Sequence, residues 1–129
     1  MNVTDVISYR QKLTEEFIIE FQNFVNWDYI SKYQSLSENI MRTFQDKVVW
    51  EYISWYQDLS ENFIIEFKDK LDFYYVAHSQ KFSYEFLLKN LELFNLHRVL
   101  DNKRLSLDMK EKVKKELFNS WLFMNRLKS

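Results

Sequence analysis

One pattern recurs along this chain at a fixed spacing of 23 residues, and it limits what the chain can fold into. The segment LTEEFIIEF, which starts at residue 13, returns as LSENIMRTF at residue 36 and as LSENFIIEF at residue 59. Five copies place a large apolar residue at their first position: Leu13, Leu36, Leu59, Phe82 and Leu105. The next position holds a hydroxyl residue in all five: Thr14, Ser37, Ser60, Ser83 and Ser106. Because a fixed period of this length is the signature of proteins built from stacked units, we expect a repeat architecture.

The repeat divides the chain into one half unit and five whole units. The half unit is 3–12, and the whole units are 13–35, 36–58, 59–81, 82–104 and 105–127. No linker-like or low-complexity segment interrupts them, so we predict a single helical repeat domain over residues 1–129.

Each unit is predicted to fold as two helices joined by a turn. The hydroxyl residue is a preferred N-cap, and the acidic residues that follow it in the first units suit the positive end of a helix. In the first unit, apolar residues at 17, 18, 21, 24 and 25 share one face of a helix of about eleven residues. Asn26 can cap a second helix, Trp27–Gln34, whereas Val49 occupies that position in the second unit and cannot cap through its side chain.

The fold class follows from the shortness of these helices. Isolated helices of this length are marginal in water, so neighbouring units must bury their apolar faces against each other. We therefore predict an all-α fold without β-sheet, a short α-solenoid of about five 23-residue helix-turn-helix units. We expect the first helix of each unit to supply most of the core, and the Tyr-rich second helix to form an amphipathic wall.

Composition narrows the classes of function. The chain has no Cys, so disulfides and thiolate metal sites are excluded, and no Gly, so it has no glycine-rich phosphate loop. Its net charge of −1 gives no strong overall attraction to nucleic acid or to an anionic membrane. The N-terminal sequence lacks the features of a signal peptide, and no apolar run is long enough to span a membrane. These features predict a cytoplasmic protein.

The repeat unit resembles a known group of sequences. It stands here as LTEEFIIEFQNFVNWDYISKYQ and LSENIMRTFQDKVVWEYISWYQ, and it is similar to a 23-residue two-helix unit in tandem-repeat proteins of giant amoebal viruses, related large DNA viruses and phages. The resemblance covers residues 3–81 well and residues 82–127 only column by column. It implies a viral repeat scaffold in the cytoplasm of a host cell, and it brings no catalytic residues with it.

No set of residues in the sequence predicts an enzyme. The two histidines, His78 and His97, lack the spacing and the additional ligands of a metal site. The adjacent acids Glu15 and Glu16 are explained by the helix N-terminus that they follow, and no histidine is placed to activate a capping hydroxyl. We predict no catalytic site, no metal and no cofactor.

The aromatic residues are the first candidates for binding a partner. Many of the 24 aromatic side chains must fill the core of a chain with a single alanine. Trp55 is different, because Lys32 and His78 fill the equivalent position in the neighbouring units, so we expect its side chain to face solvent. Exposed Trp and Tyr are typical anchors of protein interfaces. The predicted partner-binding residues are Trp55, Tyr29, Tyr52 and Tyr75.

The second candidate is a group of basic residues near the C-terminus. Residues 1–80 hold 7 Lys and Arg against 13 Asp and Glu, and residues 81–129 hold 11 against 6, so the two parts carry net charges of −6 and +5. The candidate basic patch is Lys103, Arg104, Lys110, Lys112, Lys114 and Lys115. It can be a solvated helix face, a nucleic-acid site within residues 98–115, or one end of a head-to-tail self-association.

From these features we predict a non-enzymatic, protein-binding repeat scaffold. For a viral protein, the expected partner is a host protein such as a defence factor. A nucleic-acid-binding protein and a self-associating structural protein are the alternatives, and no membrane partner is expected.

Overall fold

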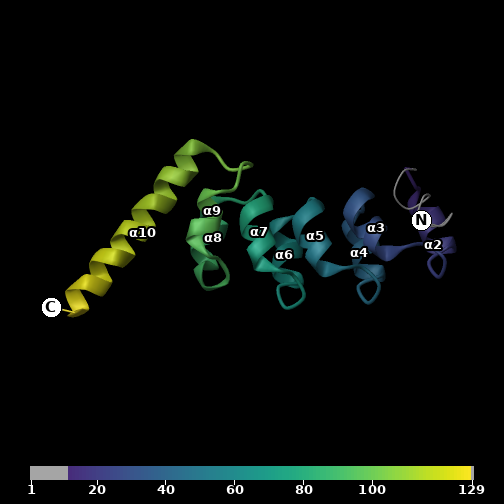
Figure 1. The fold of residues 1–129 in the computed structure, drawn as a ribbon, viewed down its shortest axis with the longest axis horizontal. Helices are drawn as coiled ribbons and strands as arrows, with labels where there is room; N and C mark the ends of the chain where they lie inside the picture. Colours follow the sequence, from purple (N-terminus) through teal and green to yellow (C-terminus); the bar gives the residue numbers. More distant parts are fainter. Residues whose placement is uncertain (1–11, 129) are drawn as a thin grey trace. The chain divides into compact units, whose positions relative to one another are not determined.

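The computed structural model describes residues 12–128, which are all-α and contain no strand. The predicted half unit 3–12 lies, apart from its last residue, outside this described part. The helices are α2 (Glu15–Glu20), α3 (Trp27–Tyr33), α4 (Glu38–Thr43), α5 (Trp50–Tyr56), α6 (Glu61–Glu66), α7 (Phe73–Ser79), α8 (Tyr84–Lys89), the 3-10 helix η1 (Leu91–Leu93), α9 (Leu96–Leu100) and α10 (Leu107–Lys128). From α2 to α10 the α-helices start 11 or 12 residues apart (Figure 1).

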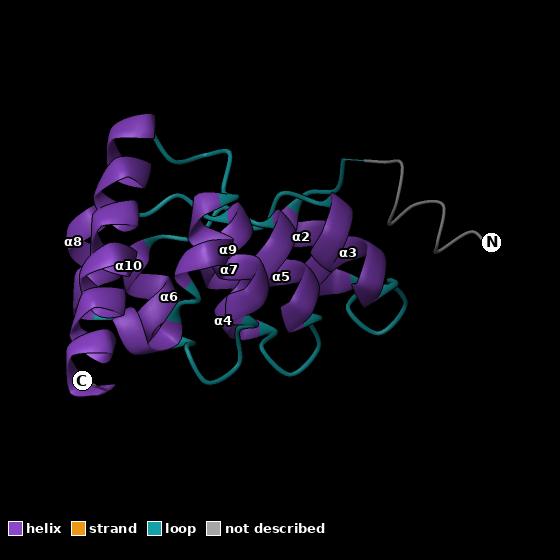
Figure 2. Cartoon of the chain, turned by 60° about the vertical axis from the view of Figure 1, so that its left-hand side comes forward, coloured by secondary structure: helices purple, strands orange, loops and turns teal. Residues whose placement is uncertain are grey.

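The chain divides into two compact units, within residues 1–72 and 73–129. We call their described parts the N-terminal unit, with helices α2 to α6, and the C-terminal unit, with helices α7 to α10. Figure 2 shows the short helices of both units joined by loops. In the N-terminal unit α3 packs against α5, and in the C-terminal unit α9 packs against both α7 and α10.

The predicted N-caps are confirmed. Thr14 Oγ1 accepts a hydrogen bond from the backbone N–H three residues later, at 3.1 Å. The hydroxyls of Ser37, Ser60, Ser83 and Ser106 accept the same bond at 3.1–3.2 Å. Asn26 caps α3 in the same way, whereas Val49 makes no side-chain cap to α5. The capping column therefore sets where most helices begin.

The predicted length of the first helix in each unit is wrong. Instead of about eleven residues, α2, α4, α6 and α8 each have six, and a turn follows. In the first unit the indole of Trp27 donates to Gln22 O at 3.0 Å, and in the second Trp50 donates to Gln45 O at 2.9 Å. A continuing helix would use these carbonyls for its own ladder, so the indole stabilises the turn that ends the helix.

The core draws on both helices of each unit, and the first helices supply the larger share of its buried apolar residues, as predicted. First helices contribute the buried residues Ile18, Ile40, Met41, Phe63, Ile64, Phe86 and Leu87. Second helices contribute Ile30, Ile53, Val76 and Val99, each fully buried. A second helix of only seven residues therefore still buries one apolar side chain completely in the core.

The last unit departs from the predicted helix-turn-helix. Residues 107–128 form the single 22-residue helix α10. The position that Asn26 and Asn95 fill as caps is Phe118 here, which has no side-chain acceptor. The turn positions before it hold Lys114, Lys115 and Glu116, all good helix formers. Without a cap or a turn signal, the helix continues.

A buried glutamine links successive helices in the N-terminal unit. Gln57 Nε2 donates to Ser31 O at 2.8 Å and to Gln34 O at 2.6 Å, and its Oε1 accepts from Leu36 N at 3.0 Å. Gln34 Oε1 accepts from Leu13 N at 2.9 Å, which repeats the last of these bonds 23 residues earlier. The carbonyls at the end of α3, which lack partners within the helix, are satisfied by this side chain.

Candidate functional site

Aromatic side chains from α3 and α5 gather on one exposed surface of the N-terminal unit. We call it the α3–α5 surface, and it comprises Tyr29, Lys32, Tyr33, Tyr52, Trp55 and Tyr56. Within α5 the rings of Trp55 and Tyr56 stack, with centroids 4.8 Å apart and planes 14° apart. Tyr29 and Tyr33 pair at 5.9 Å in α3, and Tyr52 and Tyr56 at 6.1 Å in α5. The fully buried residues Ile30 and Ile53 anchor an adjacent side of each helix in the core.

Lys32 joins the two helices across this surface. Its Nζ lies 5.3 Å from the ring centroid of Tyr33, 5.6 Å from that of Tyr52 and 5.4 Å from that of Tyr56. A side-chain hydrogen bond with Tyr33 is the largest cause that raises the pKa of Lys32; desolvation by burial opposes it, and charge interactions with Tyr33, Tyr56 and Tyr52 add smaller increases. The lysine is therefore charged at neutral pH and is held against aromatic faces by cation–π attraction.

Three of the four predicted partner-binding residues lie together on the α3–α5 surface. Trp55 is 39 % exposed, as the sequence predicted, and Tyr29 and Tyr52 are half-buried. Tyr75 belongs to α7 in the C-terminal unit, where its ring meets that of Tyr74 edge-on at 5.2 Å. Tyr75 is therefore not one of the residues of α3 and α5 that make up the α3–α5 surface.

Sequence reasoning missed Tyr33, Tyr56 and Lys32. Trp27, Ile30 and Tyr33 follow each other at steps of three residues, a spacing that in the sequence looks like one side of α3. Each three-residue step falls short of a full turn by about 60°, so Tyr33 is rotated about 120° from Trp27. It is 45 % exposed and adjoins Tyr29, four residues earlier. The spacing of four between recurring tyrosines was the signal that could have found this side.

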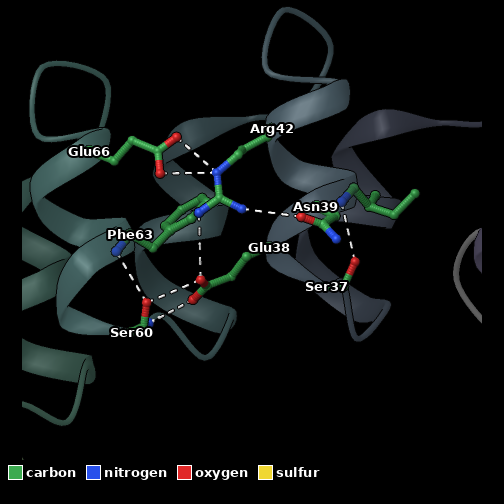
Figure 3. A network of polar contacts seen from close by, with 8 residues as sticks. Ser37, Glu38, Asn39, Arg42, Ser60, Phe63 and Glu66 are labelled. Atoms are coloured by element: carbon green, nitrogen blue, oxygen red, sulfur yellow. Dashed lines mark hydrogen bonds and ion pairs between the residues drawn. The ribbon is translucent and has the colours of Figure 1, made fainter.

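A second group of charged residues in the N-terminal unit has a structural explanation. Arg42 Nε donates to both carboxylate oxygens of Glu66, at 3.0 and 2.8 Å, and its Nη2 lies 3.9 Å from Glu38 (Figure 3). Glu38 also accepts from Ser60 N at 2.8 Å and from Ser60 Oγ at 3.1 Å. The hydrogen bond from Arg42 lowers the pKa of Glu66. Both carboxylates are paired with groups of the neighbouring helix or its cap, so their contacts are explained by the linking of α4 to α6.

The histidines and the acids do not form a metal site in the described part of the chain. His78 Nδ1 lies 3.3 Å from Ser79 Oγ, and the backbone N–H of His97 donates to Asn95 Oδ1 at 3.0 Å. Within residues 12–128 no group of three or more His, Asp or Glu side chains is placed to hold an ion.

The predicted basic residues do not converge on one side of α10. They occupy the loop before the helix and its first half: Lys103, Arg104, Lys110, Lys112, Lys114 and Lys115. Lys110 and Lys114 are four residues apart and lie on one side. Lys112 and Lys115, three apart, lie on a different side. The positive charge is therefore divided.

Acidic neighbours offset part of this charge. Lys112 Nζ lies 3.4 Å from Asp108, and Lys114 Nζ donates to Glu111 at 3.0 Å. A phosphate backbone would have to compete with both acids, so this region offers a weaker electrostatic site than its count of lysines indicates.

Comparison with known protein families, with curated proteins and with solved structures finds no match to this chain. Among residues 12–128, no helix combines the length and the apolar character that crossing a membrane requires. The α3–α5 surface is thus characterised by its own chemistry, an exposed aromatic group around one cation.

Proposed function

We propose that this protein is a non-enzymatic α-solenoid scaffold that binds a protein partner through the α3–α5 surface. The single observation that carries the proposal is the exposed cluster of Trp55, Tyr33 and Tyr56 around Lys32. Tyr and Trp supply large, rigid contact areas and dominate the binding energy of protein interfaces. Their exposure in a chain that also buries many aromatic residues supports an interface better than a packing role.

The recurring contacts of the N-terminal unit support the solenoid part of the proposal. The bonds of Gln34 and Gln57 repeat at 23 residues, and so do the caps and the indole–carbonyl bonds of Trp27 and Trp50. Stacked units of this kind present extended, rigid faces, which suit partner recognition. The five-unit division of the whole chain remains part of the proposal.

The surface also indicates the chemistry of the partner. Its centre is a lysine whose positive charge is retained, and its walls are aromatic rings. An acidic side chain flanked by apolar groups would pair with Lys32 and cover the rings of Trp55 and Tyr56. The resemblance to viral repeat proteins makes a host protein, such as a defence factor, the proposed source of that segment.

The test compares two variants of the N-terminal unit. Trp55→Ala removes the exposed anchor, whereas Phe24→Ala removes a 68 % exposed aromatic side chain outside the surface. Nuclease-treated lysate of an amoebal or bacterial host is passed over each immobilised protein, and the captured protein is then purified and titrated. We expect Trp55→Ala to raise Kd by about 30-fold or more, as loss of an interface anchor does, and Phe24→Ala to leave it unchanged.

Two outcomes would contradict the proposal. Equal affinity of the wild type and Trp55→Ala for the partner would remove the α3–α5 surface from binding. Capture that disappears on nuclease treatment would instead support nucleic-acid binding, and its affinity should then fall steeply with salt.

A further inference from the structure

The second half of α10 carries large apolar side chains that are exposed in the C-terminal unit. The first half is anchored, because Met109 and Val113 are buried. Beyond it, five side chains are 54–66 % exposed: Phe118, Trp121, Phe123, Met124 and Leu127. Figure 1 shows this end of α10 standing clear of α8 and α9. A helix segment that is apolar on most of its sides is normally buried, so a further surface is needed to cover it.

One stripe of this segment has the spacing of a helix-pairing seam. Leu117, Ser120, Met124 and Leu127 follow each other at steps of three, four and three residues. This alternation keeps a single line of side chains facing a partner helix. Ser120, near the middle, is small and allows a close approach of the two helices.

The charges flanking the stripe indicate which partner fits. Between residues 116 and 128 the charged residues are Glu116 at one end and Arg126 and Lys128 at the other. In an antiparallel pair of identical helices centred on Leu122, Glu116 of each copy lies opposite Lys128 of the other. A parallel pair would place like charges together. The segment is therefore complementary to itself in the antiparallel direction.

The same centre also matches the apolar side chains. Leu117 faces Leu127 of the second copy, and Ser120 faces Met124, so that a small residue receives a large one. Each contact occurs twice, as in the isologous interface of a two-fold dimer.

The exposed area beside the stripe supports such a pair. Phe118 lies about 140° around the helix from the centre of the stripe and stays outside the pair, whereas Trp121, Phe123, Met124 and Leu127 lie on the stripe or next to it. With about 200 Å² for each large side chain, these four present about 480 Å² in each copy, so two copies together would bury about 1,000 Å² of exposed surface, which is about the minimum for a specific interface.

From this we infer that the protein forms a two-fold homodimer through antiparallel pairing of residues 116–128 of α10. The inference concerns the C-terminal unit and is independent of partner binding at the α3–α5 surface. A dimer would present two copies of that surface and increase binding to a multivalent partner by raising the effective concentration.

The first test measures the mass of the 129-residue protein in solution over a range of concentrations, by sedimentation or by chromatography with light scattering. The wild type should be a dimer at micromolar concentration. Met124→Glu combined with Leu127→Glu places charges in the seam of both copies and should raise the dissociation constant at least about 100-fold. The matched control is Leu107→Glu, which changes a 78 % exposed leucine at the opposite end of the same helix and should leave the dimer intact.

Circular dichroism and thermal unfolding of the monomeric variant separate dimer loss from misfolding. The two replaced side chains are exposed in the monomer, so its helicity should be retained. A wild type that is monomeric at every concentration would overturn the inference. So would a dimer that persists in the double variant, or a monomer that binds anionic lipid vesicles through this segment.

A charge exchange tests the antiparallel direction. Lys128→Glu alone should weaken the dimer, because the new carboxylate would lie opposite Glu116 of the second copy and repel it. Adding Glu116→Lys should restore much of the affinity, although it also removes the 3.3 Å hydrogen bond from Tyr84. Failure of the second change to restore any affinity would contradict the antiparallel register.

Discussion

In each of the two units, a buried side-chain amide binds the carbonyls at the end of a second helix, but the residue that provides it differs. In the N-terminal unit Gln57, which follows the seven-residue helix α5, donates to the two carbonyls at the end of α3. In the C-terminal unit Asn102 Nδ2 donates to Ala77 O at 2.9 Å and to Gln80 O at 2.7 Å. Helix α9 has only five residues, so the shorter asparagine reaches from one position earlier in the unit. A side-chain amide that donates to two buried carbonyls at a helix end is therefore retained, although the residue and its column change.

The units also differ in a hydroxyl contact. Ser31 Oγ accepts from Val49 N at 2.9 Å, and Ser54 Oγ accepts from Asp72 N at 2.8 Å. The equivalent residue in the C-terminal unit is Ala77, which has no side-chain acceptor. The hydroxyl contact therefore links neighbouring helices in the N-terminal unit and cannot form at Ala77. We also expect the buried amide of Gln57 in this unit to contribute more to stability than that of Asn102.

The largest effect should follow from removing that amide. Gln57→Ala leaves two carbonyls and the N–H of Leu36 without their side-chain partner in a site that is 4 % exposed. At about 1–2 kcal/mol for each of these three orphaned groups, the free energy of unfolding should fall by about 3–6 kcal/mol. Chemical denaturation monitored by circular dichroism measures the change.

Asn102→Ala sharpens the comparison between the units. It also removes two donated bonds and an acceptor for Arg104 N, but the last group is only partly buried. The loss should be smaller, about 2–3 kcal/mol. The control is Asn62→Ala on the exposed side of α6, expected within about 0.5 kcal/mol of the wild type. A loss for Gln57→Ala as small as that of the control would contradict the importance of the bridge.

The predictable part of the fold is local and periodic. The hydroxyl caps and the missing cap at Val49 could be read from single columns, because one side chain binds a backbone group three residues away. The turn after α2 could not, because Trp27 ends the helix through a carbonyl five residues earlier, and its aromatic ring reads as an ordinary core residue. The role of Asn102 could not be predicted from the sequence either, because its two acceptors lie 22 and 25 residues away.

The candidate site was predicted in part for a related reason. Trp55 was recognised because polar residues occupy its column, a comparison between units that needs no three-dimensional information. Lys32 was counted among those polar residues, and its role depends on α3 and α5 lying side by side, so that Nζ reaches Tyr52 and Tyr56 of the next helix. The helix-pairing segment of α10 was missed because the repeat predicted a turn near Phe118.

A smaller effect should follow from exchanging the caps of α3 and α5. Asn26 and Val49 have nearly the same backbone angles, with φ, ψ of −87°, 108° and −93°, 104°. Val49→Asn can therefore supply the missing cap and should stabilise the protein by about 1 kcal/mol, less what is lost from the half-buried valine. Asn26→Val should destabilise it by about 1 kcal/mol.

Thermal and chemical unfolding of both variants, with Val49→Ala as a control for the lost side chain, measures this exchange. Destabilisation by Val49→Asn equal to that of Val49→Ala would show that the new side chain does not cap α5.

The smallest effect concerns the ion pair between Arg42 and Glu66, which the C-terminal unit lacks because Leu88 and Lys112 hold the equivalent positions. Arg42 lowers the pKa of Glu66 in the folded protein, so the pair stabilises the fold above the range where a free glutamate titrates, about pH 4 to 5. This stabilisation is lost as the pH falls and the carboxylate is protonated in the folded state as well. Glu66→Gln should therefore lower Tm slightly at pH 7, and less at pH 3 or in high salt, because both groups are solvent-exposed. Glu51→Gln, on an exposed position of α5, is the control; an equal and pH-independent change in both variants would contradict a specific contribution of the Arg42–Glu66 pair.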